Sequence, residues 1–225
     1  MKREGVWGLI TSNLFDEACK NADIEYEATK SMFVLRNKVY ALLHLKKYQD
    51  VITLAKQLIE FRKGDTSSDF ESLGIAYWAI REFAVAIDTW SRAQNSIYQD
   101  AAGGIEVQVY LYFAAVKTGQ DKLKALAIKQ IKKLLRSKRA TNWPGPMGDF
   151  LLDNISEKEM LSYVVEIPIL KERQLCEANF VAAIKQLEVG NTDEYYKNLK
   201  KCLSLGVPAY LEFMYYLAMI ELDNV

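Results

Sequence analysis

The segment 70–98 contains two apolar stripes at helical spacing, and this pattern limits the fold more than any other feature of the chain. Its first half places Leu73 and Tyr77 one helical turn apart. Its second half repeats apolar residues at intervals of four and three, at Ala86, Trp90 and Ala93. Because such spacings put residues on one face of an α-helix, the segment predicts two helices joined at the polar pair Arg81-Glu82.

Three other segments have the same layout: 31–62, 105–136 and 170–205. Tyr48 and Phe83 occupy equivalent places in the first two units and lie 35 residues apart. A regular period of this size is typical of arrays in which each helical hairpin buries its apolar faces against the next. The chain contains only four prolines and 11 glycines, and this low density of helix breakers also favours long helices.

The segment 70–98 resembles a tetratricopeptide repeat. Leu73-Gly74-x-x-Tyr77 matches the motif of that family's first helix, and Ala86-x-x-x-Trp90-x-x-Ala93 matches the motif of its second helix. The resemblance extends over 31–135 and 170–205. It implies an all-α fold, a right-handed α-solenoid of about four helix pairs with N-terminal and C-terminal capping helices.

The domain organisation follows from these units. Residues 1–30 are expected to form an N-terminal capping helix, and residues 31–135 to hold three units, at 31–62, 68–99 and 105–136. Two prolines and a glycine in Asn142–Pro146 break any helix there, so 137–166 is expected to form a Trp-Pro turn and short helices. Residues 169–225 then form the fourth unit and a closing helix.

Two local signals define helix starts in the last third of the chain. Ser156 followed by Glu159 predicts a capping box, in which each side chain bonds the other residue's backbone N–H group. Pro208 predicts the start of the closing helix, because proline is favoured in the first turn.

The composition favours a cytoplasmic protein. Lys plus Arg and Asp plus Glu both total 29, so no general attraction to nucleic acid or membrane surfaces is expected. Cys19, Cys176 and Cys202 are far apart and odd in number, which fits a reducing compartment. The apolar stretch Val6–Ile10 is too short for a signal-peptide core, and no apolar run approaches the roughly 20 residues of a membrane span.

The sequence offers no catalytic or metal-binding motif. His44 is the single histidine, which excludes sites that need two, and no cysteine or acid stands at metal-ligand spacing from it. Nucleophile elbows and glycine-rich phosphate loops are absent. We therefore expect neither an enzyme nor a cofactor, and we expect Cys176 and Cys202 to be small buried residues.

The resemblance also implies a binding surface, because tetratricopeptide arrays line their concave groove with the first helix of each unit. The groove candidates are Arg36, Asn37, Tyr40, Glu71, Ile75, Trp78, Tyr110 and Phe113. Trp78, Tyr110 and Phe113 lie off the core stripes, and such aromatics are good interface anchors. The alternative is that they pack against a neighbouring unit or against a terminal helix folded into the groove.

The segment 117–139 is strongly basic, with nine cationic residues and one acid, Asp121. Helical spacing places four of them on one face: Lys122, Lys129, Lys133 and Arg136. A solvated helix face with a basic last turn accounts for this pattern. A contact for an acidic protein surface, or for RNA, is the functional alternative, although no aromatic residues interleave to stack on bases.

These observations predict a non-catalytic module that binds one cognate protein or peptide in its groove. It could be an adaptor or an inhibitor, such as the immunity protein of a bacterial toxin, since both need the same rigid surface. Two alternatives stay open. One is an RNA-binding accessory protein that uses the basic helix, and the other is a structural subunit that forms a homodimer through its C-terminal helices.

Overall fold

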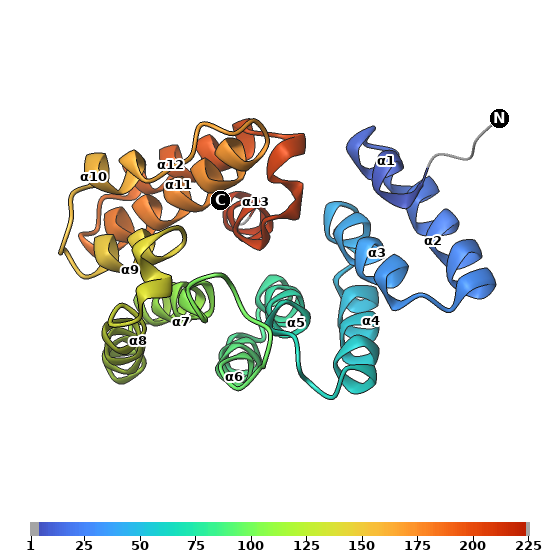
Figure 1. The fold of residues 1–225 in the computed structure, drawn as a ribbon, viewed down its shortest axis with the longest axis horizontal. Helices are drawn as coiled ribbons and strands as arrows, with labels where there is room; N and C mark the ends of the chain where they lie inside the picture. Colours follow the sequence, from blue (N-terminus) through green and yellow to red (C-terminus); the bar gives the residue numbers. More distant parts are fainter. Residues whose placement is uncertain (1–4, 224–225) are drawn as a thin grey trace.

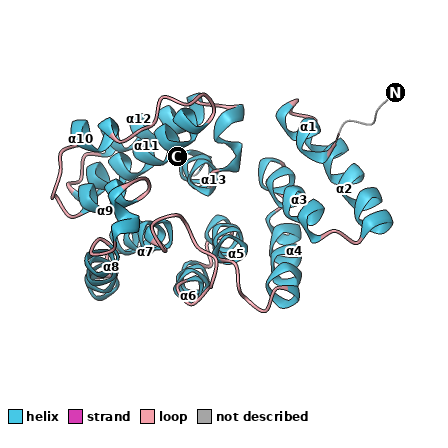
Figure 2. Cartoon of the chain, in the orientation of Figure 1, coloured by secondary structure: helices cyan, strands magenta, loops and turns pink. Residues whose placement is uncertain are grey.

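The computed structural model describes residues 5–223, and over this range the chain is all-helical, without a strand (Figures 1 and 2). The first eight helices are α1 (Val6–Thr11), α2 (Phe15–Thr29), α3 (Met32–His44), α4 (Tyr48–Phe61), α5 (Ser67–Ala79), α6 (Phe83–Ala93), α7 (Ile105–Thr118) and α8 (Asp121–Leu134). The remainder are η1 (Lys138–Thr141), α9 (Gly145–Leu151), α10 (Glu157–Ser162), α11 (Leu170–Glu188), α12 (Thr192–Ser204), η2 (Val207–Leu211) and α13 (Phe213–Asp223), where η denotes a 3₁₀-helix.

Consecutive helices pack in pairs, most extensively α11 with α12, α5 with α6 and α7 with α8. The pairs α3–α4, α5–α6, α7–α8 and α11–α12 lie in the four segments whose sequence pattern predicts helical hairpins. The N-terminal segment differs from the expected single helix, because it forms two helices, α1 and α2, that both pack against α3. Residues 1–4 of the predicted N-terminal capping helix and residues 224–225 of the predicted closing segment lie outside the described range.

The same turn joins the two helices of each pair. One residue adopts a positive φ in each turn, and these residues are Lys46, Arg81, Gly119 and Gly190, with φ angles of 55°, 67°, 67° and 75°. In each case the next residue donates its backbone N–H to a carbonyl five residues back, as Glu82 does to Tyr77 over 3.0 Å. This left-handed helix end satisfies carbonyls that a helix otherwise leaves unpaired, and it repeats although only two of the four residues are glycine.

Gly74 sets the close approach of α5 and α6. A Cβ atom built on Gly74 would lie 2.2 Å from Nε1 of Trp90, which is far inside van der Waals contact. Trp90 is fully buried and donates its Nε1–H to the carbonyl oxygen of Glu71 over 3.2 Å. The ring therefore lies against bare backbone, and glycine at this position is required by packing.

The C-terminal helix α13 lies on the inner side of the helix pairs, between the α11–α12 pair and helices α3 and α5 (Figure 1). The expectation of a helix that caps the end of the array is therefore wrong. Pro208 is the second residue of η2, which begins at Val207, and α13 starts only at Phe213. Because α13 is buried on nearly all sides, its sequence carries apolar residues around the whole helix.

Glu221 of α13 is a buried charge with three partners. It accepts hydrogen bonds from Nε1 of Trp78 over 2.8 Å and from the hydroxyl of Tyr195 over 2.9 Å. The ammonium group of Lys117 lies 2.6 Å from the same carboxylate. These three partners come from α5, α12 and α7, so one side chain ties α13 to three helix pairs.

His44 is held in an aromatic cluster that joins α3 to the C-terminal elements. Its ring stacks on Phe15 with centroids 4.2 Å apart and meets the edges of Tyr210 at 4.1 Å and Tyr216 at 5.0 Å. Its Nε2 atom is buried and has no hydrogen-bond partner within residues 5–223. Burial lowers the pKa of His44 to about 4, so the imidazole is neutral and acts as a packing residue.

Replacement of Gly74 by alanine is expected to lower the free energy of unfolding by about 1–3 kcal/mol, the usual range for overpacking a core. The methyl group has to displace the Trp90 ring from the backbone of α5. Urea unfolding followed by circular dichroism measures the change. Gly5→Ala is the matched control, because no atom lies within 4 Å of its added Cβ, and an equal loss in both variants would contradict this account of the α5–α6 contact.

Replacement of His44 by phenylalanine is expected to reduce the acid sensitivity of the fold. The pKa of His44 in the folded state lies below the usual 6.5. Between pH 6.5 and pH 4 this histidine therefore takes up a proton in the unfolded chain but not in the folded chain. The folded state loses stability as the pH falls through this range. The wild type should lose about 2 kcal/mol more than the variant between about pH 7 and about pH 5. If the free energy of unfolding falls equally with pH in the two proteins across this range, the low pKa of His44 is refuted.

Candidate functional site

A polar cavity of about 370 Å³ opens on the inner side of the helix pairs. Its walls come from the first helix of each of the four pairs and from the chain around η2. The lining residues are Phe33, Arg36, Asn37, Tyr40, Ser68, Glu71, Glu106, Arg173, Leu211, Glu212 and Phe213. We call this hollow the inner cavity. It is the one place among the described cavities where residues from all four pairs meet.

Two arginines on opposite walls fix the geometry of the inner cavity. Arg36 of α3 donates to the hydroxyl of Ser68 over 2.8 Å, which joins α3 to α5. Arg173 of α11 forms an ion pair with Glu212, the residue that links η2 to α13. Phe33, one turn before Arg36, stands at the rim with 64% of its side chain exposed. The walls of the inner cavity are therefore charged and are held by the Arg36–Ser68 and Arg173–Glu212 contacts. The rim carries the exposed aromatic ring of Phe33.

Four carboxyl groups converge around the inner cavity, from Glu71, Glu106, Glu177 and Glu212. Burial raises the pKa of Glu71 to about 7. Burial, followed by the charges of the neighbouring acids, raises the pKa of Glu106 and Glu177 well above the usual range. After burial, the nearby carboxylate of Glu212 is the largest cause that raises the pKa of Glu177.

Asp100 adds a fifth acid beside this cluster and orders the start of α7. Its carboxylate accepts from the backbone N–H groups of Ala102, Gly104 and Glu106 over 2.8–3.0 Å. Gly104 has a φ of +113°, a conformation open to glycine, and this turn lets the N–H groups face inwards. The carboxylate thus satisfies donors at the positive end of α7 and positions Glu106 at the cavity.

The structure places the predicted groove residues at two different depths. Arg36 and Asn37 remain partly exposed, and both line the inner cavity together with Tyr40 and Glu71. Ile75, Trp78, Tyr110 and Phe113 are at most 2% exposed. The expectation that these four line an open groove is therefore corrected, because neighbouring helices cover them. Trp78 bonds to α13 through Glu221, and Phe113 packs on Phe180 of α11.

Sequence reasoning missed three charged residues of this site, Arg173, Glu177 and Glu212. All three come from segments far along the chain from α3 and α5, so no local spacing connects them. One signal was present. Glu177 stands inside the otherwise apolar run that surrounds Cys176 and Ala178, and an acid at such a position requires a buried partner.

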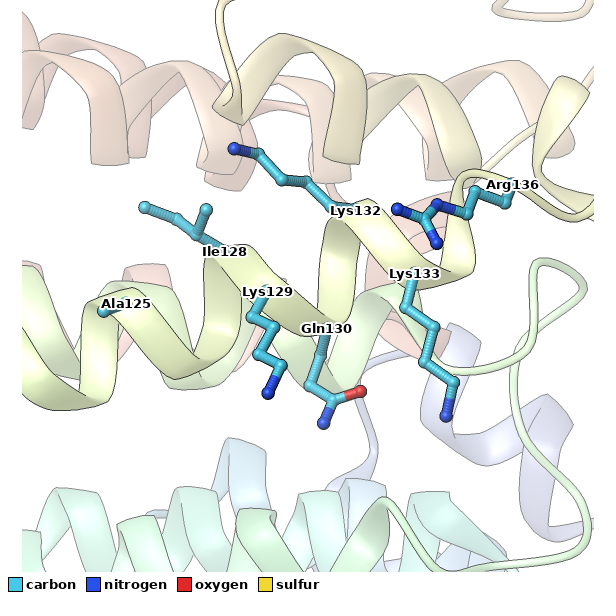
Figure 3. Close-up of a pocket in the computed structure, with 7 residues that line it drawn as sticks. All are labelled: Ala125, Ile128, Lys129, Gln130, Lys132, Lys133 and Arg136. Atoms are coloured by element: carbon cyan, nitrogen blue, oxygen red, sulfur yellow. The ribbon is translucent and has the colours of Figure 1, made fainter.

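The predicted basic residues lie together on the outer surface of α8, and none of them lines the inner cavity. Lys122, Lys129, Lys133 and Arg136 are all exposed. Figure 3 shows Lys129, Gln130 and Lys133 projecting to one side of α8 and Lys132 to the other, with Arg136 just past the end of the helix. Lys129, Lys133 and Arg136 line one hollow, and the placement of all four cations on one face stays a prediction.

Two smaller expectations from the sequence are confirmed. Ser156 and Glu159 form the capping box at the start of α10, with reciprocal bonds of 3.2 Å and 2.7 Å. Cys176 and Cys202 are buried free thiols, and the thiol of Cys202 donates to the carbonyl of Cys176 over 3.3 Å. They act as packing residues in the α11–α12 pair.

Within residues 5–223, no three His, Cys, Asp or Glu side chains are placed to hold a metal ion. None of the helices in the same range has the length and apolar character to cross a membrane. The inner cavity offers a different chemistry. A positive charge that enters would lower the pKa of these carboxyls. They can then release protons to the solvent and pair with the cationic group as carboxylates.

Replacement of Glu71 by glutamine is expected to stabilise the protein at alkaline pH. The pKa of Glu71 in the folded state lies above the usual 4.5. As the pH rises from 4.5 through 7, the unfolded chain gives up this proton more readily than the folded chain. The folded state therefore loses the stability that it has below pH 4.5. Glutamine has the size of glutamate and can keep the hydrogen bond to Ser67. Because glutamine does not ionise, the variant does not lose stability as the pH rises. Relative to wild type, the variant should gain about 2 kcal/mol of unfolding free energy between about pH 5 and about pH 8. A gain that does not vary with pH in urea unfolding would contradict the ionisation of Glu71.

Comparisons with known proteins leave the chain without an assigned family. No family model matches it, and no curated protein matches it. The argument for its function therefore rests on its own residues, chiefly the inner cavity and the four helix pairs that build it.

Proposed function

We propose that this chain is a non-catalytic protein-interaction module of the tetratricopeptide kind, whose helix pairs form a right-handed α-solenoid. On this proposal one cognate protein partner inserts a side chain or a short segment into the inner cavity. The observation that carries the proposal is that the first helices of all four pairs converge there on a polar, accessible hollow. Deep sites with few, well-placed polar groups are typical of specific recognition.

The repeated turn supports the tetratricopeptide part of the proposal. Four helical hairpins end their first helix with a residue of positive φ and the same pair of backbone hydrogen bonds, a helix end that α1, α4 and α9 share. Units that share backbone geometry while their sequences diverge are expected in an array of structural repeats. The close fit of Gly74 against Trp90 is consistent with the role of the small residue in the family's first helix.

The rim of the inner cavity supports the binding part of the proposal. Phe33 offers an exposed aromatic ring, and Asn37 on the next turn offers an amide beside the partly exposed Arg36. Aromatic and arginine side chains carry a large share of binding energy when a partner covers them. The carboxyls below them favour a cationic group from the partner, so the partner surface should be basic at the point of entry.

The proposal includes an adaptor and an inhibitor, such as the immunity protein of a bacterial toxin. Both need a rigid, preorganised surface, and the inner cavity is braced by the Arg36–Ser68 and Arg173–Glu212 contacts. Preorganisation favours tight binding in either case, because less ordering cost is incurred on association.

The double variant Phe33→Ala, Asn37→Ala is expected to lose the partner that the wild type retains from a lysate of its own source cells. Truncation at the centre of a contact costs about 2 kcal/mol or more, roughly a 30-fold loss of affinity. Affinity capture read by mass spectrometry identifies the protein, and titration of the purified partner measures the loss.

Phe61→Ala is the matched control for this experiment, because Phe61 is 66% exposed and lies outside the inner cavity. It should bind as the wild type does. Equal retention of the partner by the double variant and the control would exclude the inner cavity as the binding site.

A further inference from the structure

The charge of this neutral chain is divided very unevenly. Nine of its 29 basic residues, and only one of its 29 acidic residues, lie in the segment 117–139. The other residues therefore carry an acidic excess of eight, and this segment a basic excess of the same size. Most of the basic excess falls on α8 and on the start of η1. The molecule thus has one strongly positive surface.

The cations on the outer side of α8 have no internal partner. We define the basic face of α8 by five exposed residues, Lys122, Lys129, Lys132, Lys133 and Arg136. None of the five forms an ion pair or a side-chain hydrogen bond within residues 5–223. By contrast, Lys124 on the inner side of the same helix pairs with Glu188, and Lys117 pairs with Glu221. The helix therefore satisfies its inward lysines and leaves its outward ones unpaired.

An exposed leucine lies within this basic face. Leu126 has 58% of its side chain exposed, and the helical spacing puts it one turn from both Lys122 and Lys129. Ala125 beside it is exposed as well. A shallow hollow of about 690 Å³ runs along this face, lined by Ala125, Ile128, Lys129, Gln130, Lys132, Lys133 and Arg136 (Figure 3). The surface thus combines unpaired cations with the exposed side chain of Leu126, which lies beside the hollow and outside its lining.

We propose that the basic face of α8 is a second docking surface, for an acidic amphipathic helix of a protein partner. Four turns of helix separate Lys122 from Arg136, a span of roughly 21 Å, which matches a partner helix of about 15 residues. Acidic side chains on both edges of that helix face the lysines, and an apolar residue at its centre covers Leu126. This surface shares no residue with the inner cavity, so the inference goes beyond the function proposed above.

The exposed Leu126 favours a protein over a nucleic acid. A phosphate backbone neutralises lysines but has nothing to cover a leucine, and single-stranded bases need aromatic rings to stack on. No aromatic side chain belongs to this face. Burial of Leu126 together with complementary charges at the rim is the usual composition of a protein–protein contact.

Fluorescence anisotropy with three labelled probes tests the proposal on the full chain. The first probe is a helical peptide of about 15 residues with glutamates bordering a leucine strip. The second has serine in place of each leucine, and the third is an oligouridylate of similar length. We expect the first peptide to bind most tightly, and its affinity to fall at least about tenfold in Lys129→Glu, Lys133→Glu. Leu126→Ser should weaken the leucine peptide several-fold and leave the serine peptide unchanged.

Lys20→Glu, Lys200→Glu is the control with the same net charge, since both residues are exposed and lie outside this face. It should bind the leucine peptide within about twofold of wild type at about 0.15 M salt, where distant surface charges are screened. Tighter binding of the oligouridylate than of the leucine peptide would overturn the proposal in favour of RNA. An equal loss in the control, or no effect of Leu126→Ser, would also overturn it.

Discussion

The buried carboxylate of Glu221 is the contact on which the arrangement of the helices depends. It lies on α13 and bonds to Trp78 of α5, Lys117 of α7 and Tyr195 of α12. A carboxylate that is only 4% exposed is stable in the interior only if such partners compensate for its lost hydration. Loss of one partner of a buried ion pair typically costs about 3–5 kcal/mol, so the position of α13 and the order of the helix pairs are mutually constrained.

The placement of α13 decides which surfaces remain for binding. Because it lies against α5, Trp78 becomes a core residue. Tyr110 is covered by Trp90 of α6, and Phe113 by Phe180 of α11. The same helix brings Glu212 and Phe213 to the edge of α3 and thereby closes one wall of the inner cavity. The site is therefore a product of the C-terminal segment as much as of the repeated units.

The two proposed binding surfaces differ in their electrostatics for a single reason. Three acids lie at or beside the inner cavity, and burial raises the pKa of all three: Glu71, Glu106 and Glu177. The unpaired lysines remain on the outer side of α8. The chain is neutral in total, but the inner cavity and the basic face of α8 are proposed to bind partners of opposite charge. Such a molecule can in principle hold a basic segment at one site and an acidic helix at the other.

The sequence by itself determined the local structure. Apolar spacing gave the four helical hairpins, Ser156 and Glu159 gave a helix start, and the spacing of Lys122, Lys129, Lys133 and Arg136 gave the exposed basic face. These features depend on residues within a few turns of one another. Tertiary structure alone decided that α13 lies inside the array, that Trp78 is buried and that Arg173 and Glu212 reach the cavity. Those outcomes depend on contacts between segments over 100 residues apart, such as Trp78 with Glu221, and the helical periodicity of a segment carries no information about its distant partners.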